Sequence, residues 1–192
     1  MTNHDIVPPH LVVKAMRDSG YRNAAYAIAE LIDNAIQAGA TQVELLCGER
    51  RQLVRQRERT QVSEIAVLDN GSGMSADVLR MALQFGNGTR LDDRSGIGRF
   101  GMGLPNSSIS QARRVDVWSW QDGVENAIHT YLDIDEIIGG KLSQVPQPQF
   151  KAVPEIWRTI GTCFEQAGTL VVWSTIDLCM CCLLYTSPSP RD

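Results

Sequence analysis

The chain has 192 residues, an ordinary globular composition and a formal net charge of −4 at pH 7. The length suits one domain with a sizeable core, and the mild acidity gives no reason to expect a nucleic-acid partner. No apolar run is long enough to cross a bilayer, and the first residues lack the basic and apolar segments of a secretion signal. We therefore expect a cytoplasmic protein with no membrane partner.

Two helices are predicted at the start of the chain. Residues 9–20, "PHLVVKAMRDSG", form a short one that ends near Gly20. Residues 23–39, "NAAYAIAELIDNAIQAG", form the main one, with Asn23 as the expected N-cap and Gly39 as the C-terminal stop. Apolar residues recur at helical spacing and predict one buried face: Ile28, Leu31, Ile32, Ala35 and Ile36.

A polar stripe follows the same helical spacing on another face of this main helix. It consists of Glu30, Asp33, Asn34 and Gln37. One interpretation is a solvated surface. The other is a site that needs a carboxylate and an amide one helical turn apart.

Two β-rich runs follow, "TQVELLC" at residues 41–47 and "VSEIAVLD" at residues 62–69. The segment between them, "GERRQLVRQRERT", is dense in arginine. A solvated hairpin or loop is favoured over a nucleic-acid patch, because no aromatic residues are interleaved with the arginines.

The second polar stretch is "VLDNGSGMS", residues 67–75, where an apolar strand breaks into a Gly-x-Gly turn. Asp69 at that break can accept a hydrogen bond from an exocyclic amine such as that of adenine, and the glycines permit close approach of the backbone to a ligand. A plain Asp-Asn-Gly turn is the alternative. A short helix is predicted next, in "SADVLRMALQFG", with Ser75 as its cap.

The third stretch is "GIGRFGMGLP", residues 96–105, with four glycines before a predicted helix. Free backbone N–H groups at such a position form an anion-binding nest. The string also fits Gly-x-Gly-x-x-Gly, but "TRLDDRS" before it is not the strand that a dinucleotide fingerprint requires.

The remaining predicted elements are strands. "RRVDVWSW" and "AIHTYLDI" are expected to pair, residues 139–155 read as a loop or linker, and "GTLVVWS" at residues 168–174 is a final apolar strand. The order lacks a regular β-α-β alternation, which favours an α+β layer of helices on one mixed sheet.

Together the three stretches resemble the GHKL ATPase superfamily of the gyrase B subunit, the heat-shock chaperone, sensor histidine kinases and MutL. "ELIDNA" is similar to its N box, "DNGSGM" and "GIGRFGMGLP" to its two glycine boxes, and "GTLVVWS" to its closing Gly-Thr strand. The resemblance covers residues 24–174 and is closest to MORC-like and MutL-like ATP-binding domains. It implies a two-layer Bergerat-type sandwich, with helices packed on one face of a mixed, mostly antiparallel sheet, and ATP and Mg²⁺ as cofactors.

The resemblance also implies a role for individual residues. Glu30 would be the general base, Asn34 the Mg²⁺ ligand, and Asp33 would sit near the adenine or its waters. Asp69 would bind the adenine amine, supported by Thr169. Further cofactor-binding residues would line the base pocket or the lid around the triphosphate: Gly71, Gly73, Met74, Asn87, Gly88, Thr89, Gly96, Ile97, Gly98, Arg99, Phe100, Gly101, Met102, Gly103 and Leu104.

The function implied is Mg-dependent ATP hydrolysis that acts as a conformational and dimerisation switch in a longer, homodimeric protein. One alternative is the ATP-binding half of a histidine-kinase-type phosphotransferase, although the histidines at positions 4, 10 and 129 are isolated. A module that binds ATP without hydrolysing it is another. A nucleic-acid partner is hinted at only by the arginine-rich segment.

The last eleven residues, "CLLYTSPSPRD" at positions 182–192, match the translation of a common transposon-type sequencing adaptor residue by residue. We therefore expect an ATP-binding domain over residues 1–178 that is incomplete at its C-terminus, followed by a non-native tail. In the MutL, gyrase and MORC-like relatives a lysine from a following domain reaches the γ-phosphate. Lys14, Lys141 and Lys151 match no such motif, which predicts weak hydrolysis by this chain.

Overall fold

An antiparallel sheet forms one layer of the computed structural model, which describes residues 9–21, 23–54, 57–85 and 103–177. Its six strands run in the order β1-β2-β6-β3-β4-β5, and every pairing between them is antiparallel. The strands are β1 (Val43–Val54), β2 (Arg57–Asp69), β3 (Ala112–Trp120), β4 (Ile128–Asp133), β5 (Gln149–Phe150) and β6 (Gly168–Ile176). The α+β sandwich expected from the sequence is confirmed, with a sheet more uniform than a mixed one.

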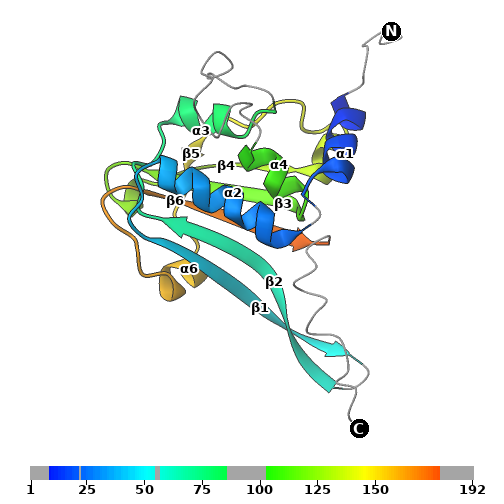
Figure 1. Ribbon diagram of the computed structural model, residues 1–192, viewed down its shortest axis with the longest axis horizontal. Coiled ribbons are helices and arrows are strands. Elements are labelled where there is room, and N and C mark those ends of the chain that lie inside the picture. The colour runs from blue at the N-terminus through cyan, green and yellow to red at the C-terminus, as the bar shows by residue number, and fades with distance from the viewer. Residues whose placement is uncertain (1–8, 22, 55–56, 86–102, 178–192) are drawn as a thin grey trace.

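Helices form the second layer (Figure 1). They are α1 (Pro9–Ser19), α2 (Ala24–Gln37), α3 (Ala76–Ala82), α4 (Gly103–Ile109) and α5 (Ile134–Ile138). Short helix α6 (Glu155–Ile160) packs on the opposite face of the sheet through Trp157. Among the described helices, none combines the length and the apolar character that a bilayer crossing requires.

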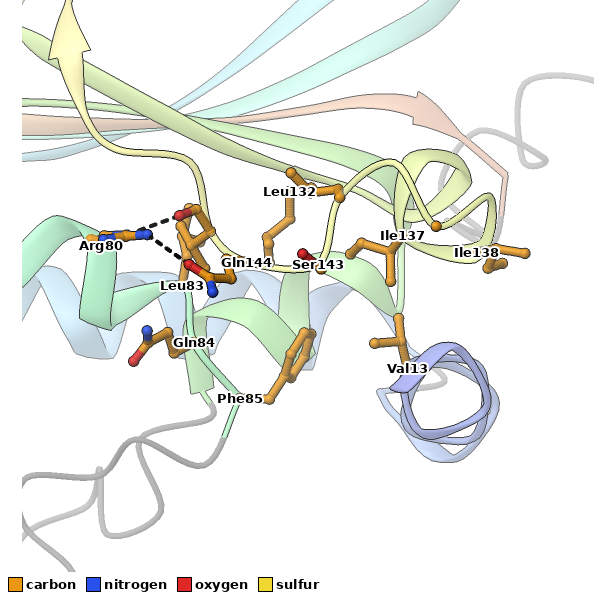
Figure 2. Close-up of a pocket in the computed structure, with 13 residues that line it drawn as sticks. Val13, Arg80, Leu83, Gln84, Phe85, Leu132, Ile137, Ile138, Ser143 and Gln144 are labelled. Atoms are coloured by element: carbon orange, nitrogen blue, oxygen red, sulfur yellow. Dashed lines mark hydrogen bonds between the residues drawn. The ribbon is translucent and has the colours of Figure 1, made fainter. Parts of the chain in front are cut away.

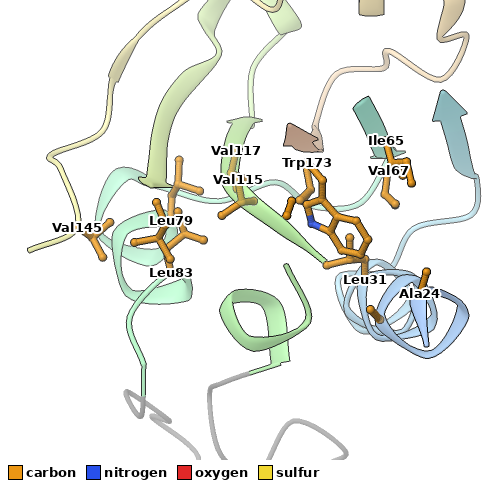
Figure 3. Close-up of a cluster of buried hydrophobic side chains, with 14 residues drawn as sticks. Ala24, Leu31, Ile65, Val67, Leu79, Leu83, Val115, Val117, Val145 and Trp173 are labelled. Carbon is orange, nitrogen blue, oxygen red and sulfur yellow. The ribbon is translucent and has the colours of Figure 1, made fainter. Parts of the chain in front are cut away.

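The sheet separates two hydrophobic cores, one on each face. Alternate residues of the central strands contribute to each core, because successive side chains of a strand point to opposite faces. The core beneath α6 contains Leu68, Trp118 and Trp120. Figure 3 shows the core between the sheet and the helix layer, whose labelled side chains are Ala24, Leu31, Ile65, Val67, Leu79, Leu83, Val115, Val117, Val145 and Trp173.

Helix α2 begins and ends where the sequence predicts. The Asn23 side chain accepts a hydrogen bond from the Ala25 N–H at 2.8 Å, and Gly39 has a φ of +78°. The buried stripe differs from the prediction, because Ile36 is 60% exposed. The residues that α2 buries are Ala24, Ala27, Leu31 and Ala35.

The arginine-rich segment forms a β-hairpin, since β1 and β2 remain paired from Val43–Asp69 to Val54–Arg57. The sequence did not predict α5, β5 or α6. Helix α5 starts at an N-cap, Asp133, whose side chain accepts hydrogen bonds from two backbone N–H groups. Strand β5 is only two residues long, and it lies in the segment predicted to be a loop.

Candidate functional site

The ends of two neighbouring strands bring Asp69 and Thr169 together. Asp69 is the last residue of β2 and pairs with Thr169 of β6; the two residues are 7% and 8% exposed. Burial raises the pKa of Asp69 from 3.8 to about 6, although backbone hydrogen bonds from Gly71 and Thr169 act in the opposite direction. At neutral pH the carboxyl group is therefore mostly ionised and accepts hydrogen bonds only.

A cavity of about 80 Å³ opens beside this pair. Its walls are largely apolar, with polar groups contributed by Asn34, Asp69 and Thr169. It contains six of the predicted site residues: Asn34, Asp69, Gly73, Met74, Leu104 and Thr169. Because ligand pockets usually exceed about 300 Å³, this space suits only a part of a ligand, one that is mostly apolar and carries a hydrogen-bond donor.

The glycines after Asp69 allow the chain to pass close to its neighbours. The Gly71 N–H donates to Asp69 Oδ1 at 2.8 Å. Gly73 has a φ of +64°, and a Cβ there would lie 2.0 Å from the backbone oxygen of Trp120. Any other residue at position 73 would move the loop away from β3, so the Gly-x-Gly pattern is required by backbone packing as well as by access to a ligand.

Ser119 on β3 connects this loop to β6, and sequence analysis missed it. Its fully buried hydroxyl accepts a hydrogen bond from the Met74 N–H at 2.8 Å and donates one to the Gly168 carbonyl at 3.1 Å. The Thr169 hydroxyl lies 3.1 Å away. One signal was present in the sequence: strand alternation puts Ser119 on the same face as the core residues Val115 and Val117.

Glu30 on α2 faces the beginning of α4. The Tyr21 hydroxyl donates to Glu30 Oε2 at 3.1 Å, and burial together with the Glu30 charge raises the pKa of Tyr21. A Cβ added to Gly103 would lie 2.0 Å from Glu30 Oε1. Glu30 therefore has one oxygen held by a phenol and the other directed at the position where α4 begins.

Asn34, one turn after Glu30, lines the Asp69 cavity. Its Nδ2 atom is buried without a hydrogen-bond partner among the described residues. The two terminal atoms of an amide exchange by rotation, so the side chain can present its oxygen to a cation. No three acidic, histidine or cysteine side chains in the described part of the chain gather as a metal site. A cation would then depend on Asn34 and on ligand or water oxygens, as Mg²⁺ commonly does.

Asp33 lies apart from the Asp69 cavity. It is exposed and lines a separate surface hollow of about 380 Å³ together with Tyr21, Tyr26 and Glu30. Its expected place near the adenine stays a prediction, and the hollow puts it on the side of α2 where Glu30 lies.

Most of the predicted lid residues lie outside the described residues, so their roles also stay predictions. They are Asn87, Gly88, Thr89, Gly96, Ile97, Gly98, Arg99, Phe100, Gly101 and Met102. The predicted adaptor-derived tail, residues 182–192, lies outside them too.

A wider pocket of about 750 Å³ contains none of the predicted site residues. Figure 2 shows it between α1, α3, α5 and the loop before β5, with aliphatic side chains such as Leu132 and Ile137 directed inward. Arg80 is its charged residue, and its guanidinium donates to the Val145 carbonyl and to Gln147. These bonds use Arg80 to hold the loop that precedes β5.

Comparisons with known proteins find a matching family and several relatives. A family model described as "Histidine kinase-, DNA gyrase B-, and HSP90-like ATPase" matches residues 21–162. The DNA mismatch repair protein MutL of Agrobacterium fabrum is 35% identical over 124 residues, covering 62% of this chain and 18% of that protein. MutL of Azorhizobium caulinodans is 38% identical over 79 residues, covering 41% of this chain and 11% of that protein.

A eukaryotic relative is also similar to this chain. ATPase MORC2B of Mus musculus is 29% identical over 119 residues, covering 58% of this chain and 11% of that protein. The chain therefore spans less than a fifth of the length of each of these three relatives.

Proposed function

Because the chain belongs to the histidine kinase-, DNA gyrase B- and HSP90-like ATPase family, we propose that its site binds ATP with Mg²⁺ and hydrolyses the terminal phosphate. The observation that carries this proposal is the arrangement of α2. Asn34 lines the cavity that holds Asp69, and Glu30 one turn earlier faces Gly103 at the start of α4. One helix thereby spans the distance between a base-binding end and a reacting end.

At the base-binding end, the adenine ring enters the apolar cavity beside Met74 and Leu104. Its exocyclic amine donates to Asp69, whose carboxylate is available as an acceptor at neutral pH. The Thr169 hydroxyl supports that contact from the neighbouring strand.

At the phosphate end, Asn34 offers its amide oxygen to the metal ion. When bound, Mg²⁺ supplies charge neutralisation at the phosphates. The glycine-rich lid over residues 96–103 would add backbone N–H donors to the triphosphate.

Glu30 acts as the general base. It accepts a proton from the attacking water at Oε1 while the Tyr21 hydroxyl holds Oε2. The water oxygen forms a bond to the γ-phosphorus, the bond from that phosphorus to the bridging oxygen breaks, and ADP leaves. An acid whose second oxygen is fixed presents the first in one orientation, which is what positioning a water molecule requires.

In the full-length protein, nucleotide binding would order the lid and promote homodimerisation, so that hydrolysis resets a conformational switch. The cytoplasm is the compartment proposed for this activity. A lysine from a following domain would complete the charge neutralisation, and this chain alone should hydrolyse ATP slowly.

The test measures binding and chemistry separately in Glu30→Gln. Titration calorimetry with Mg-ATP should give an affinity within about twofold of the wild type, because the substitution removes no contact with the adenine ring. Single-turnover hydrolysis of labelled ATP, with protein in excess, should slow by about 10²–10⁴-fold. Glu155→Gln, on α6 across the sheet, is the matched control and should leave both unchanged. Hydrolysis at the wild-type rate in Glu30→Gln would reject Glu30 as the general base. Failure of the wild type to bind Mg-ATP would reject the proposed ATPase function.

A further inference from the structure

The Ser119 hydroxyl has three neighbours and only one proton. The Met74 N–H can only donate to it, and the Gly168 carbonyl can only accept from it. Ser119 therefore donates its hydroxyl proton to the Gly168 carbonyl oxygen. With the Ser119 proton assigned to the Gly168 carbonyl, the third neighbour, the Thr169 hydroxyl at 3.1 Å, is assigned as the donor in its contact with Ser119.

This assignment fixes what Thr169 shows to the cavity. Its single proton points at Ser119, so only oxygen lone pairs remain for a ligand. Thr169 lines the cavity beside Asp69, whose ionised carboxylate also only accepts. The two side chains together form a wall of acceptors.

We propose that Ser119 is a positioning residue that makes the site select adenine over guanine, by orienting the Thr169 hydroxyl as an acceptor. The inference rests on the proposed nucleotide-binding function. Adenine carries an amino group, a donor, at the position where guanine carries a carbonyl oxygen. A donor matches the acceptor wall, whereas a carbonyl oxygen faces lone pairs and leaves buried groups unpaired, which is an effective basis for rejection.

A merely structural role for Ser119 makes a different prediction. Its bond to the Met74 N–H holds the glycine loop against β3, and loss of that bond alone would weaken all nucleotides equally. The ratio of ATP to GTP affinity therefore separates the two roles, whereas the ATP affinity alone does not.

The experiment measures dissociation constants for Mg-ATP and Mg-GTP by calorimetry in the wild type and in Ser119→Ala. In the variant the Thr169 hydroxyl is free to rotate and donate, so the preference for ATP should fall about tenfold, equivalent to 1.4 kcal/mol and within the range for a buried hydrogen bond. Ser119→Cys keeps a weak donor and acceptor of similar size, and it should show a smaller fall. It also provides the readout if Ser119→Ala does not fold.

Two further variants test whether Ser119 acts through Thr169. Thr169→Val should itself lower the preference, and Ser119→Ala combined with Thr169→Val should lower it no further than Thr169→Val alone. The control is Thr130→Val on β4, which removes another buried hydroxyl, bonded to the Pro146 carbonyl at 2.8 Å. It should leave the ratio unchanged.

Each result is decisive. A folded Ser119→Ala or Ser119→Cys protein that keeps the wild-type ratio overturns the inference and leaves the proposed function standing. Additive losses in the double variant overturn it as well, since Ser119 would then act independently of Thr169. A wild-type protein that binds neither nucleotide overturns the proposed function itself, and the inference with it.

Discussion

The two ends of the site are built differently. At the base-binding end, Asp69, Ser119 and Thr169 lie on paired strands, each less than a tenth exposed, and hydrogen bonds connect them to one another or to the adjoining backbone. At the reacting end, Glu30 is half-buried on a helix and is held by the single hydroxyl of Tyr21.

This contrast indicates why strands suit recognition and a helix face suits the reaction. A strand at the centre of a sheet is fixed on both sides by its ladder, so it can hold a rigid pattern of acceptors. A helix face that borders a loop leaves its side chains room for water and phosphate. The proposed recognition of the nucleobase accordingly lies on the sheet, and the proposed chemistry lies on helix α2.

Asp69→Asn should break the base-binding end most strongly. The amide turns a donor toward the adenine amine in a buried position, which costs on the order of 1–3 kcal/mol, or about 5- to 150-fold in ATP affinity. Calorimetry with Mg-ATP measures this loss. Glu30→Gln provides the comparison at the other end, and equal losses of affinity in the two variants would contradict the division described above.

Lowering the pH should weaken the base-binding end in the wild type. The pKa of Asp69 is about 6, so at pH 5 only about a tenth of the carboxyl groups are ionised, and the preference for ATP over GTP should fall about tenfold between pH 7.5 and pH 5. A protonated Asp69 can also donate to a guanine oxygen. Because both nucleotides share the same phosphates, the ratio cancels their titration, and a ratio independent of pH would count against Asp69.

The same carboxyl group should destabilise the nucleotide-free protein. The pKa of Asp69 rises from 3.8 to about 6 on folding, so its contribution to stability is fully present below pH 3.8 and is lost as the pH rises through 6. Asp69→Asn should therefore be more stable than the wild type by about 3 kcal/mol at pH 7.5, with a gap of roughly half that size at pH 5. Thermal unfolding at both pH values measures this, and a gap that widens on acidification would refute it.

Tyr21→Phe should have the smallest effect of these variants, and it tests the reacting end alone. Removing the hydroxyl frees Glu30 Oε2, and loss of one hydrogen bond to a charged group should slow single-turnover hydrolysis by about three- to tenfold. ATP affinity should change less than about twofold, because Tyr21 makes no proposed contact with the adenine ring. Tyr26→Phe is the matched control, since Tyr26 lines the same hollow but is 69% exposed. A loss of affinity without a loss of rate would remove Tyr21 from the reacting end.

Local patterns in the sequence determined most of the elements. Asn23 and Gly39 delimit α2 because capping and a left-handed turn act within a few residues. Runs of apolar and β-branched residues predicted β2, β3 and β6, because the side chains on both faces of these central strands reach one of the two cores. Helix α5 and strand β5 escaped prediction because elements this short depend on tertiary packing rather than on periodicity.

The sequence by itself also determined which stretches carry polar groups into apolar surroundings, and three of those polar residues, Asn34, Asp69 and Thr169, line one cavity. Only the tertiary structure decided which faces are buried: Ile36 is exposed, and Asp33 lies in a different hollow from Asp69. Only the tertiary structure brought Ser119 within hydrogen-bonding distance of Met74 and Thr169, residues 45 and 50 positions away. Such hydrogen bonds join residues of strands and loops that are neighbours only in space. The spacing of these residues along the chain therefore cannot predict them.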